Sequence, residues 1–134
     1  MTHFDWPVRV YYEDTDAGGV VYHANYLRFF ERARTEWLRQ LGYSQAEMAR
    51  DQQLLFTVVS LETRFHLPAR LDDALRVRSV ASVAGGASVN FMQELWRDAE
   101  SPQLLVSATV RVACLQPVTF KPRRLPDALR KELC

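Results

Sequence analysis

The sequence predicts a single α+β domain over residues 1–134, in which one long helix precedes a run of antiparallel strands. Two observations support this fold class. Apolar residues between His23 and Leu41 recur every three or four positions, which is the period of an amphipathic helix. Four later segments alternate apolar and polar residues, which is the period of a strand. Consecutive strands, rather than strands that alternate with helices, favour an α+β fold over a doubly wound sheet.

The elements are expected, in chain order, as a strand over residues 6–12, a loop over 13–19, helices over 23–41 and 44–50, and strands over 54–66, 75–83, 88–97 and 104–115. Asn25 is the expected N-cap of the long helix and Gly42 its stop. Arg32 and Glu36 are one turn apart and are expected to pair. Ser44 and the residue three positions later stand in capping-box register for the second helix.

Glycine and proline residues mark the turns between the strands. Gly85–Gly86 is typical of a tight hairpin, and Pro117 and Pro122 are expected to end the regular structure and leave a basic tail. Cys114 lies in an alternating apolar run and is expected to be buried. Because one helix cannot cover the whole sheet and the sheet has open edges, the sequence favours self-association.

The composition excludes several classes of protein. Hydrophobic residues make up 48% and charged residues 25%, and 17 basic against 16 acidic residues give a net charge of +1. This balance argues against disorder and against the overall basic charge of a nucleic-acid-binding protein. The longest weakly polar run, residues 54–61, is shorter than the ~20 residues of a membrane-spanning helix. The first residues lack the pattern of a secretory signal and two cysteines make no disulfide framework, so we expect a cytoplasmic protein.

The most informative segment is Y-Y-E-D-T-D-A-G-G-V-V-Y-H-A-N-Y, from Tyr11 to Tyr26. It places carboxylates on a glycine loop that leads into the start of the long helix, where backbone N–H groups are unpaired and carry partial positive charge. A carboxylate beside N–H groups that can bind a developing negative oxygen is the equipment of acyl transfer. Because the helix dipole disfavours a cation there, His23 is expected to be neutral near pH 7 and able to exchange a proton.

Other interpretations of this segment stay open from the residues alone. An Asp beside Gly-Gly is commonly a turn former, and His23 is about as well explained as a residue that only hydrogen-bonds the loop. Asp14 and Asp16 have a spacing that can hold a metal, but as a calcium loop the twelfth position is Asn25 instead of the bidentate Glu. An aspartyl-phosphatase would need a parallel α/β core, which the later strands do not offer.

Three blocks of the chain resemble the 4-hydroxybenzoyl-CoA thioesterase family, and within it the YbgC branch that is encoded with the bacterial Tol-Pal envelope system. They are E-D-T-D-A-G-G-V-V-Y-H-A-N-Y at residues 13–26, F-F-E-R-A-R-T-E-W-L at 29–38 and H-L-P-A-R-L-D-D-x-L at 66–75. The resemblance implies a hotdog fold, in which a curved antiparallel sheet of about five strands wraps the long helix. It also implies a homodimer or homotetramer with active sites at the subunit boundary.

The resemblance further implies an acyl-CoA thioesterase that uses no metal and no organic cofactor. Asp16 would be the essential acid, either as a nucleophile that forms a mixed anhydride or as a general base for water, and the sequence does not separate these roles. His23 would lend its backbone N–H to the thioester carbonyl, with help from its side chain. Coenzyme A carries phosphates, so basic residues are expected along its path. The predicted substrate-binding residues are Gly19, Tyr22, Arg64 and Arg70.

Two alternatives belong to other functional classes. One is a non-catalytic hotdog module that binds acyl groups, and the presence of Asp16 favours the enzyme over it. The other is a thioesterase for acyl carrier protein that acts with phospholipid-synthesis enzymes, located peripherally at the inner membrane. A hotdog dehydratase would use a His with a separate acid, for which no matching block is visible. The basic residues that could contact phosphates, acidic lipid or a partner protein are Arg76, Arg78, Lys121, Arg123, Arg124, Arg130 and Lys131.

Overall fold

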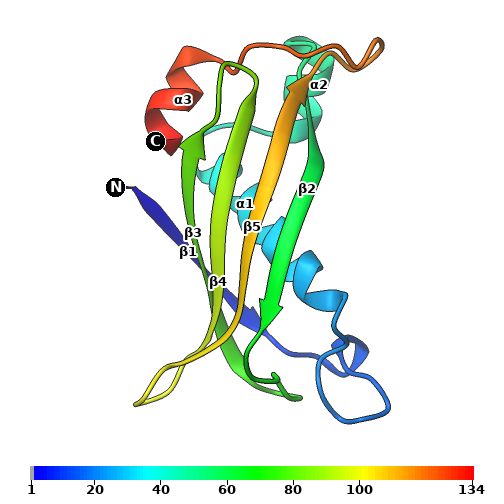
Figure 1. Cartoon of the computed structure of the whole chain (residues 1–134), viewed down its shortest axis with the longest axis vertical. Coiled ribbons are helices and arrows are strands. Elements are labelled where there is room, and N and C mark those ends of the chain that lie inside the picture. The colour runs from blue at the N-terminus through cyan, green and yellow to red at the C-terminus, as the bar shows by residue number, and fades with distance from the viewer. Residues whose placement is uncertain (1) are drawn as a thin grey trace.

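A five-stranded antiparallel sheet curves around one long helix in the computed structural model, which describes residues 2–134 (Figure 1). The order of strands across the sheet is β1-β3-β4-β5-β2, with antiparallel pairing throughout. The strands are β1 (His3–Arg9), β2 (Leu55–Phe65), β3 (Ala74–Val83), β4 (Ser88–Arg97) and β5 (Gln103–Leu115). The α+β class and the hotdog arrangement are therefore confirmed.

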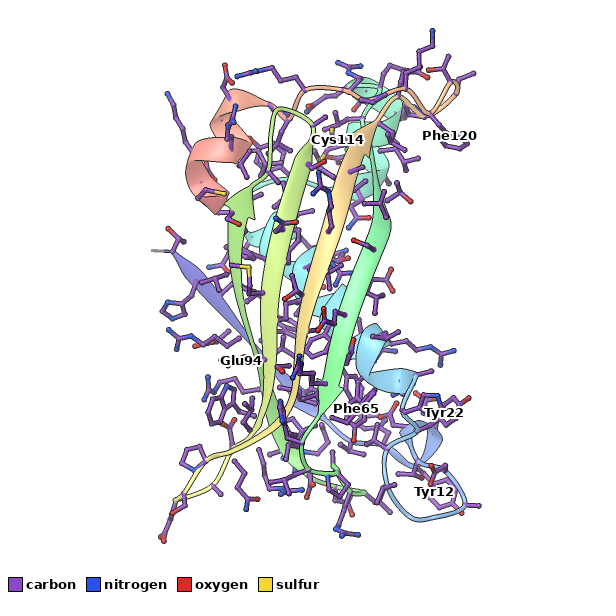
Figure 2. All side chains as sticks on the ribbon, viewed as in Figure 1. Tyr12, Tyr22, Phe65, Glu94, Cys114 and Phe120 are labelled. Atoms are coloured by element: carbon purple, nitrogen blue, oxygen red, sulfur yellow. The ribbon has the colours of Figure 1, made fainter. Side chains whose placement is uncertain are left out.

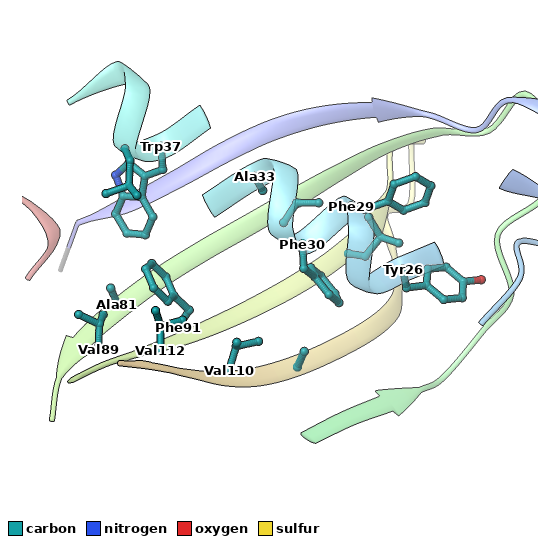
Figure 3. Close-up of a cluster of buried hydrophobic side chains, with 14 of the residues drawn as sticks. Tyr26, Phe29, Phe30, Ala33, Trp37, Ala81, Val89, Phe91, Val110 and Val112 are labelled. Atoms are coloured by element: carbon teal, nitrogen blue, oxygen red, sulfur yellow. The ribbon is translucent and has the colours of Figure 1, made fainter. Parts of the chain in front are cut away.

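The helix α1 (Asn25–Gln40) forms the centre of the core. Its apolar residues follow a helical period, so they share one face and are buried against the sheet. Figure 3 shows Phe30 and Trp37 pointing towards the strands, where the Trp37 ring meets the edge of Phe91 on β4 at a centroid distance of 6.0 Å. Full burial of each such side chain contributes roughly 1.5–3 kcal/mol. The buried residues of α1 are Asn25, Tyr26, Phe29, Phe30, Ala33, Trp37 and Leu38.

The ends of the helices agree only partly with the sequence predictions. Gly42 follows α1 with φ +94°, a conformation that favours glycine, so the predicted stop is confirmed. Ser44 caps α2 (Gln45–Asp51) by accepting the Glu47 N–H at 3.4 Å, as expected. The prediction that Asn25 is the N-cap of α1 is wrong, because Ala24 holds that position and Asn25 is the first residue of the helix.

Two further predictions at the ion pairs and at the first strand need correction. Glu36 pairs with Arg39, which lies three residues later, and not with Arg32. The first strand covers His3–Arg9 and ends before the predicted residues 10–12, because a short 3-10 turn, η1 (Tyr12–Asp14), begins the loop that follows.

The predicted basic tail is also wrong in part, since the chain forms a further helix, α3 (Asp127–Leu133), directly after Pro126. Leu125, Leu129 and Leu133 are spaced four apart and are almost fully buried. Leu129 and Leu133 are one turn apart on the same face of α3, Leu125 lies just before the helix, and the basic residues lie mainly outside that face. Among the described residues, no helix is long and apolar enough to cross a membrane.

Candidate active site

Asp16 lies in the loop between η1 and α1, on a tight turn. The Asp16 N–H donates to the Val20 oxygen at 2.9 Å, and the Gly19 N–H donates to the Asp16 backbone oxygen at 3.0 Å. Gly19 has φ +79°, a conformation that a residue with a Cβ rarely adopts. The exposed Asp16 carboxylate accepts the Gly18 N–H through Oδ1 at 2.8 Å. The turn thus fixes one carboxylate oxygen and leaves the group in contact with solvent.

Asp14 is the buried member of the motif and fastens this loop to α1. Its Oδ1 accepts the Asn25 Nδ2–H at 2.7 Å, and its Oδ2 accepts the Tyr11 N–H at 2.8 Å. Its backbone oxygen accepts the Tyr22 N–H at 2.9 Å. This role is not among the predictions from the sequence, where its signal is an Asn at the start of a helix, eleven residues after an Asp. The two carboxylates therefore differ: Asp14 holds the loop, and Asp16 is free to act on a ligand.

His23 lies directly before the N-cap of α1, at the same end of the molecule as Asp16. Its ring packs on Tyr22 with a centroid distance of 4.6 Å. Within residues 2–134, the backbone N–H groups of His23 and Ala24 have no hydrogen-bond acceptor. Both residues precede Asn25, the first residue of α1, whose own N–H donates to the Tyr22 oxygen at 2.8 Å, so the two free N–H groups lie at the positive end of the helix dipole. They can therefore donate to an oxygen that becomes negative during a reaction.

Phe65, at the end of β2, completes this aromatic cluster and was missed by the sequence analysis. The residue is 55% exposed, and the centre of its ring lies 6.5 Å from that of His23 and 5.8 Å from that of Tyr26. Figure 2 shows Tyr12, Tyr22 and Phe65 at one end of the molecule, opposite Cys114 and Phe120. Sequence alone gives no signal for Phe65, because the contact depends on where the edge strand ends relative to α1.

Tyr26 connects the aromatic cluster to the core. Its hydroxyl accepts the Ala69 N–H at 3.1 Å. Burial raises the pKa of Tyr26, and the negative charges of Asp16 and Asp73 add to this shift. The phenol therefore stays neutral near pH 7. The effect of the Asp16 charge on the pKa of Tyr26 shows that the two groups lie close together.

The structure brings Arg70 to the loop but places Arg64 elsewhere. Arg70 forms an isolated bridge with Val20, so its backbone runs beside the glycine turn. Arg64 precedes Phe65 on β2, and neighbouring residues of a strand point to opposite faces. Its side chain is exposed, lies 3.5 Å from Glu62 and lines a hollow of about 450 Å³ on the outer face of the sheet. This placement does not support the prediction that Arg64 contacts a ligand at this loop.

A groove of about 390 Å³ runs between α1 and β2, and apolar side chains line much of it. Leu27 of α1 lies one turn beyond His23, and Leu61 shares the inner face of β2 with Phe65. One end of the groove therefore adjoins the aromatic cluster. A groove of this size suits a small ligand. In the part of the chain that the structure describes, no cluster of three or more His, Cys, Asp or Glu residues could hold a metal ion.

Comparisons with known proteins agree with this geometry. The thioesterase-like superfamily matches residues 10–133. The chain is 49% identical over 127 residues to the acyl-CoA thioesterase YbgC of Haemophilus influenzae, covering 95% of this chain and 91% of the relative. It is 47% identical over 131 residues to the acyl-CoA thioester hydrolase YbgC of Escherichia coli, covering 98% and 96%. The crystal structure of a 1,4-dihydroxy-2-naphthoyl-CoA thioesterase from Synechocystis is similar with a TM-score of 0.92 at 27% identity, covering 99% of this chain and 96% of that one.

Proposed function

The chain belongs to the thioesterase-like superfamily, and we propose that it hydrolyses acyl-CoA thioesters with Asp16 as the catalytic carboxylate. The match over residues 10–133 and the identity of 47% to 49% with YbgC enzymes support the reaction class. One observation supports the role of Asp16: an exposed carboxylate, fixed by a glycine turn, lies near the two free N–H groups of His23 and Ala24 that directly precede α1.

Catalysis begins with the polarisation of the thioester carbonyl. Its oxygen accepts hydrogen bonds from the N–H groups of His23 and Ala24, which stabilise the negative charge that develops there. Asp16 then acts in one of two ways. It attacks the carbonyl carbon and forms a mixed anhydride that water hydrolyses, or it takes a proton from a water that attacks directly. In both routes the C–S bond breaks, one water is consumed, and the products are the free acid and coenzyme A.

A thioester is the expected substrate because a carboxylate is a weak nucleophile and needs a reactive carbonyl. A thioester carbonyl has less resonance protection than an amide, and a thiolate is a good leaving group. The His23 side chain, which packs on Tyr22, is assigned to the leaving sulfur as a hydrogen-bond donor, and the thiolate takes its proton from water. Gly19 permits close approach of the ligand to the backbone, and the exposed Tyr22 ring covers one side of the reacting group. Arg70 pairs with Val20 of this loop through an isolated backbone bridge, and we assign its side chain to the phosphates of coenzyme A.

We further propose that two copies of the chain associate through β2. This strand lies at the edge of the sheet, so one side of its backbone has no strand to pair with among the described residues. Val58, Val59 and Leu61 are 43%, 54% and 46% exposed. An exposed apolar edge strand is a ready surface for pairing with another strand. A homodimer formed in this way is the unit from which a homotetramer would be built.

Acyl carrier protein is the alternative carrier of the acyl group. The observation that favours it is the group of exposed basic residues between β5 and α3, which includes Lys121 and Arg123 and suits an acidic partner. This alternative keeps the same chemistry at Asp16. In this alternative, the protein would act beside phospholipid-synthesis enzymes at the inner membrane.

The experiment is a measurement of thiol release from a panel of short, long and aromatic acyl-CoAs and one acyl carrier protein thioester. We expect turnover of at least one acyl-CoA, unchanged by a chelator because Asp16 acts without a metal. Turnover of the carrier-protein thioester alone would favour the alternative carrier. No turnover across the panel, together with tight acyl-CoA binding, would identify a non-catalytic acyl-binding module and contradict the proposal. Activity that a chelator removes and a divalent metal restores would contradict the metal-free mechanism.

A further inference from the structure

The groove between α1 and β2 contains a half-buried cation that forms no ion pair within the described residues. Arg34 lines this groove, and among residues 2–134 its guanidinium forms no ion pair. Its Nη1–H donates to the Gln93 Oε1 at 2.9 Å, and the group lies 6.0 Å from the centre of the Phe91 ring. Burial lowers the pKa of Arg34, and the charge of Glu31 opposes this shift only in part. A cation held out of water is unfavourable until an anion reaches it.

Gln93 holds the guanidinium in place. It is almost completely buried, and its Nε2 donates to the Phe30 oxygen and to the Ser79 Oγ, each at 3.0 Å. Both ends of the amide are therefore engaged, and its orientation is determined by the core. One of the five N–H groups of Arg34 is used by this network, which leaves others for a ligand in the groove.

A second unpaired polar group lies closer to the catalytic loop. The hydroxyl of Thr63 is buried and has no hydrogen-bond partner within residues 2–134. Alternation along β2 places Thr63 on the same face as Leu61 and Phe65, which is the face turned to α1. Buried polar groups without partners are rare in folded proteins and are satisfied by water or by a ligand. The face of β2 that is turned to α1 thus carries a polar group as well as apolar side chains.

The spacing along α1 relates Arg34 to the reacting thioester. Eleven residues separate His23 from Arg34, which is about 16 Å along a helix axis. Side chains lean towards the helix N-terminus, so the guanidinium is several ångström closer than its Cα. An extended acyl chain advances roughly 1.3 Å per C–C bond. Roughly eight to twelve carbons therefore span the distance from the thioester to the Arg34 guanidinium.

We propose that Arg34 makes this groove selective for acyl groups that end in a carboxylate at the position remote from the thioester. The inference rests on the proposed thioesterase function and names its substrate class. The other charged residues that line the groove are Arg28 and Glu31, which leaves a net positive charge of one with Arg34. A terminal carboxylate pairs with the free N–H groups of Arg34, and a plain hydrocarbon end leaves them unsatisfied. A site built for hydrogen bonding discriminates strongly against an analogue that lacks the polar group.

The test compares coenzyme A monothioesters of C8, C10 and C12 α,ω-dicarboxylic acids with octanoyl-, decanoyl- and dodecanoyl-CoA. We expect kcat/KM of the parent protein to favour the dicarboxylic ester at one or more lengths by at least about tenfold. Arg34→Met is expected to remove this preference, so that the dicarboxylic and the plain ester of one length give kcat/KM values within about threefold of each other. Arg34→Lys should keep part of the preference, because it keeps the charge and loses the planar fork. The matched control is Arg32→Met on the exposed side of α1, which should retain the parent preference.

Two results would overturn this inference while the proposed function stands: equal or better turnover of the plain esters at every length, or a dicarboxylic preference that survives in a folded Arg34→Met protein. If Arg34→Met does not fold, the parent's preference and the Arg34→Lys result decide. If no ester is hydrolysed, the proposed function fails, and calorimetric binding of the same esters to the parent protein decides instead. Tighter binding of the dicarboxylic ester supports the role of Arg34, and equal or weaker binding rejects it.

Discussion

Asp14 and Asp16 are two residues apart in the sequence and have opposite environments. Asp14 is buried and accepts hydrogen bonds from Asn25 and Tyr11, whereas Asp16 is exposed and accepts one from Gly18. The difference arises because the η1 turn directs the first carboxylate inwards, and the glycine turn holds the second outwards. At the scale of single residues, the site is therefore built from one anchoring carboxylate and one reactive carboxylate.

The anchoring role of Asp14 leads to a stability prediction. Asp14→Ala leaves the buried Asn25 amide and the Tyr11 N–H without their acceptor, so we expect a loss of about 1–3 kcal/mol in the free energy of unfolding. Urea unfolding measures this loss, and Glu13→Ala is the matched control because Glu13 is exposed. Equal stability of Asp14→Ala and the control would show that these hydrogen bonds do not fasten the loop.

At the scale of elements, the sequence predicts best where a period repeats. The stripe on α1 and the alternation along β3, β4 and β5 were recognised because each buried residue has a partner three, four or two positions away. The α3 helix was missed, although Leu125, Leu129 and Leu133 have the same four-residue spacing. One short helix provides only two turns of signal, and Pro117 and Pro122 before it suggested an end of regular structure.

The α3 helix is predicted to contribute substantially to stability. Leu129 is 0% exposed, so Leu129→Ala leaves a cavity and is expected to lower the free energy of unfolding by about 2–5 kcal/mol. Lys131→Ala, at an exposed position of the same helix, should change it by less than about 0.5 kcal/mol. Thermal or urea unfolding decides, and similar stabilities for the two variants would mean that α3 packs only loosely on the sheet.

At the scale of the whole molecule, sequence reasoning gives the site in part. The block that carries Asp16, Gly19 and His23 is continuous in the chain, so its residues are recognised together. Phe65 and Thr63 of β2 are distant in sequence from Arg34 of α1, and the two elements border one groove only in the folded chain (Figure 1). Contacts between elements that are distant in sequence leave no local pattern in a single sequence, so the groove could not be predicted.

Association through β2 is the prediction that belongs to this scale. We expect the parent protein to be at least a dimer in solution, and Val59→Lys to reduce its mass to that of a monomer, because a lysine on an edge strand opposes strand pairing. Val118→Lys, which changes an 80% exposed residue outside β2, should keep the parent mass. Light scattering measures both. A parent monomer, or an unchanged mass in Val59→Lys, would contradict pairing through this edge.

The central claim is that the Asp16 carboxylate performs the hydrolysis, and kcat/KM of Asp16→Asn beside Glu13→Gln tests it most directly. Both variants replace an exposed carboxylate in the same segment by an amide of equal size. For the best acyl-CoA of the panel, we predict a loss on the order of 10²–10⁴-fold for Asp16→Asn, with an unchanged melting temperature, and parent activity for Glu13→Gln. Parent-like turnover by Asp16→Asn would remove this residue from the mechanism.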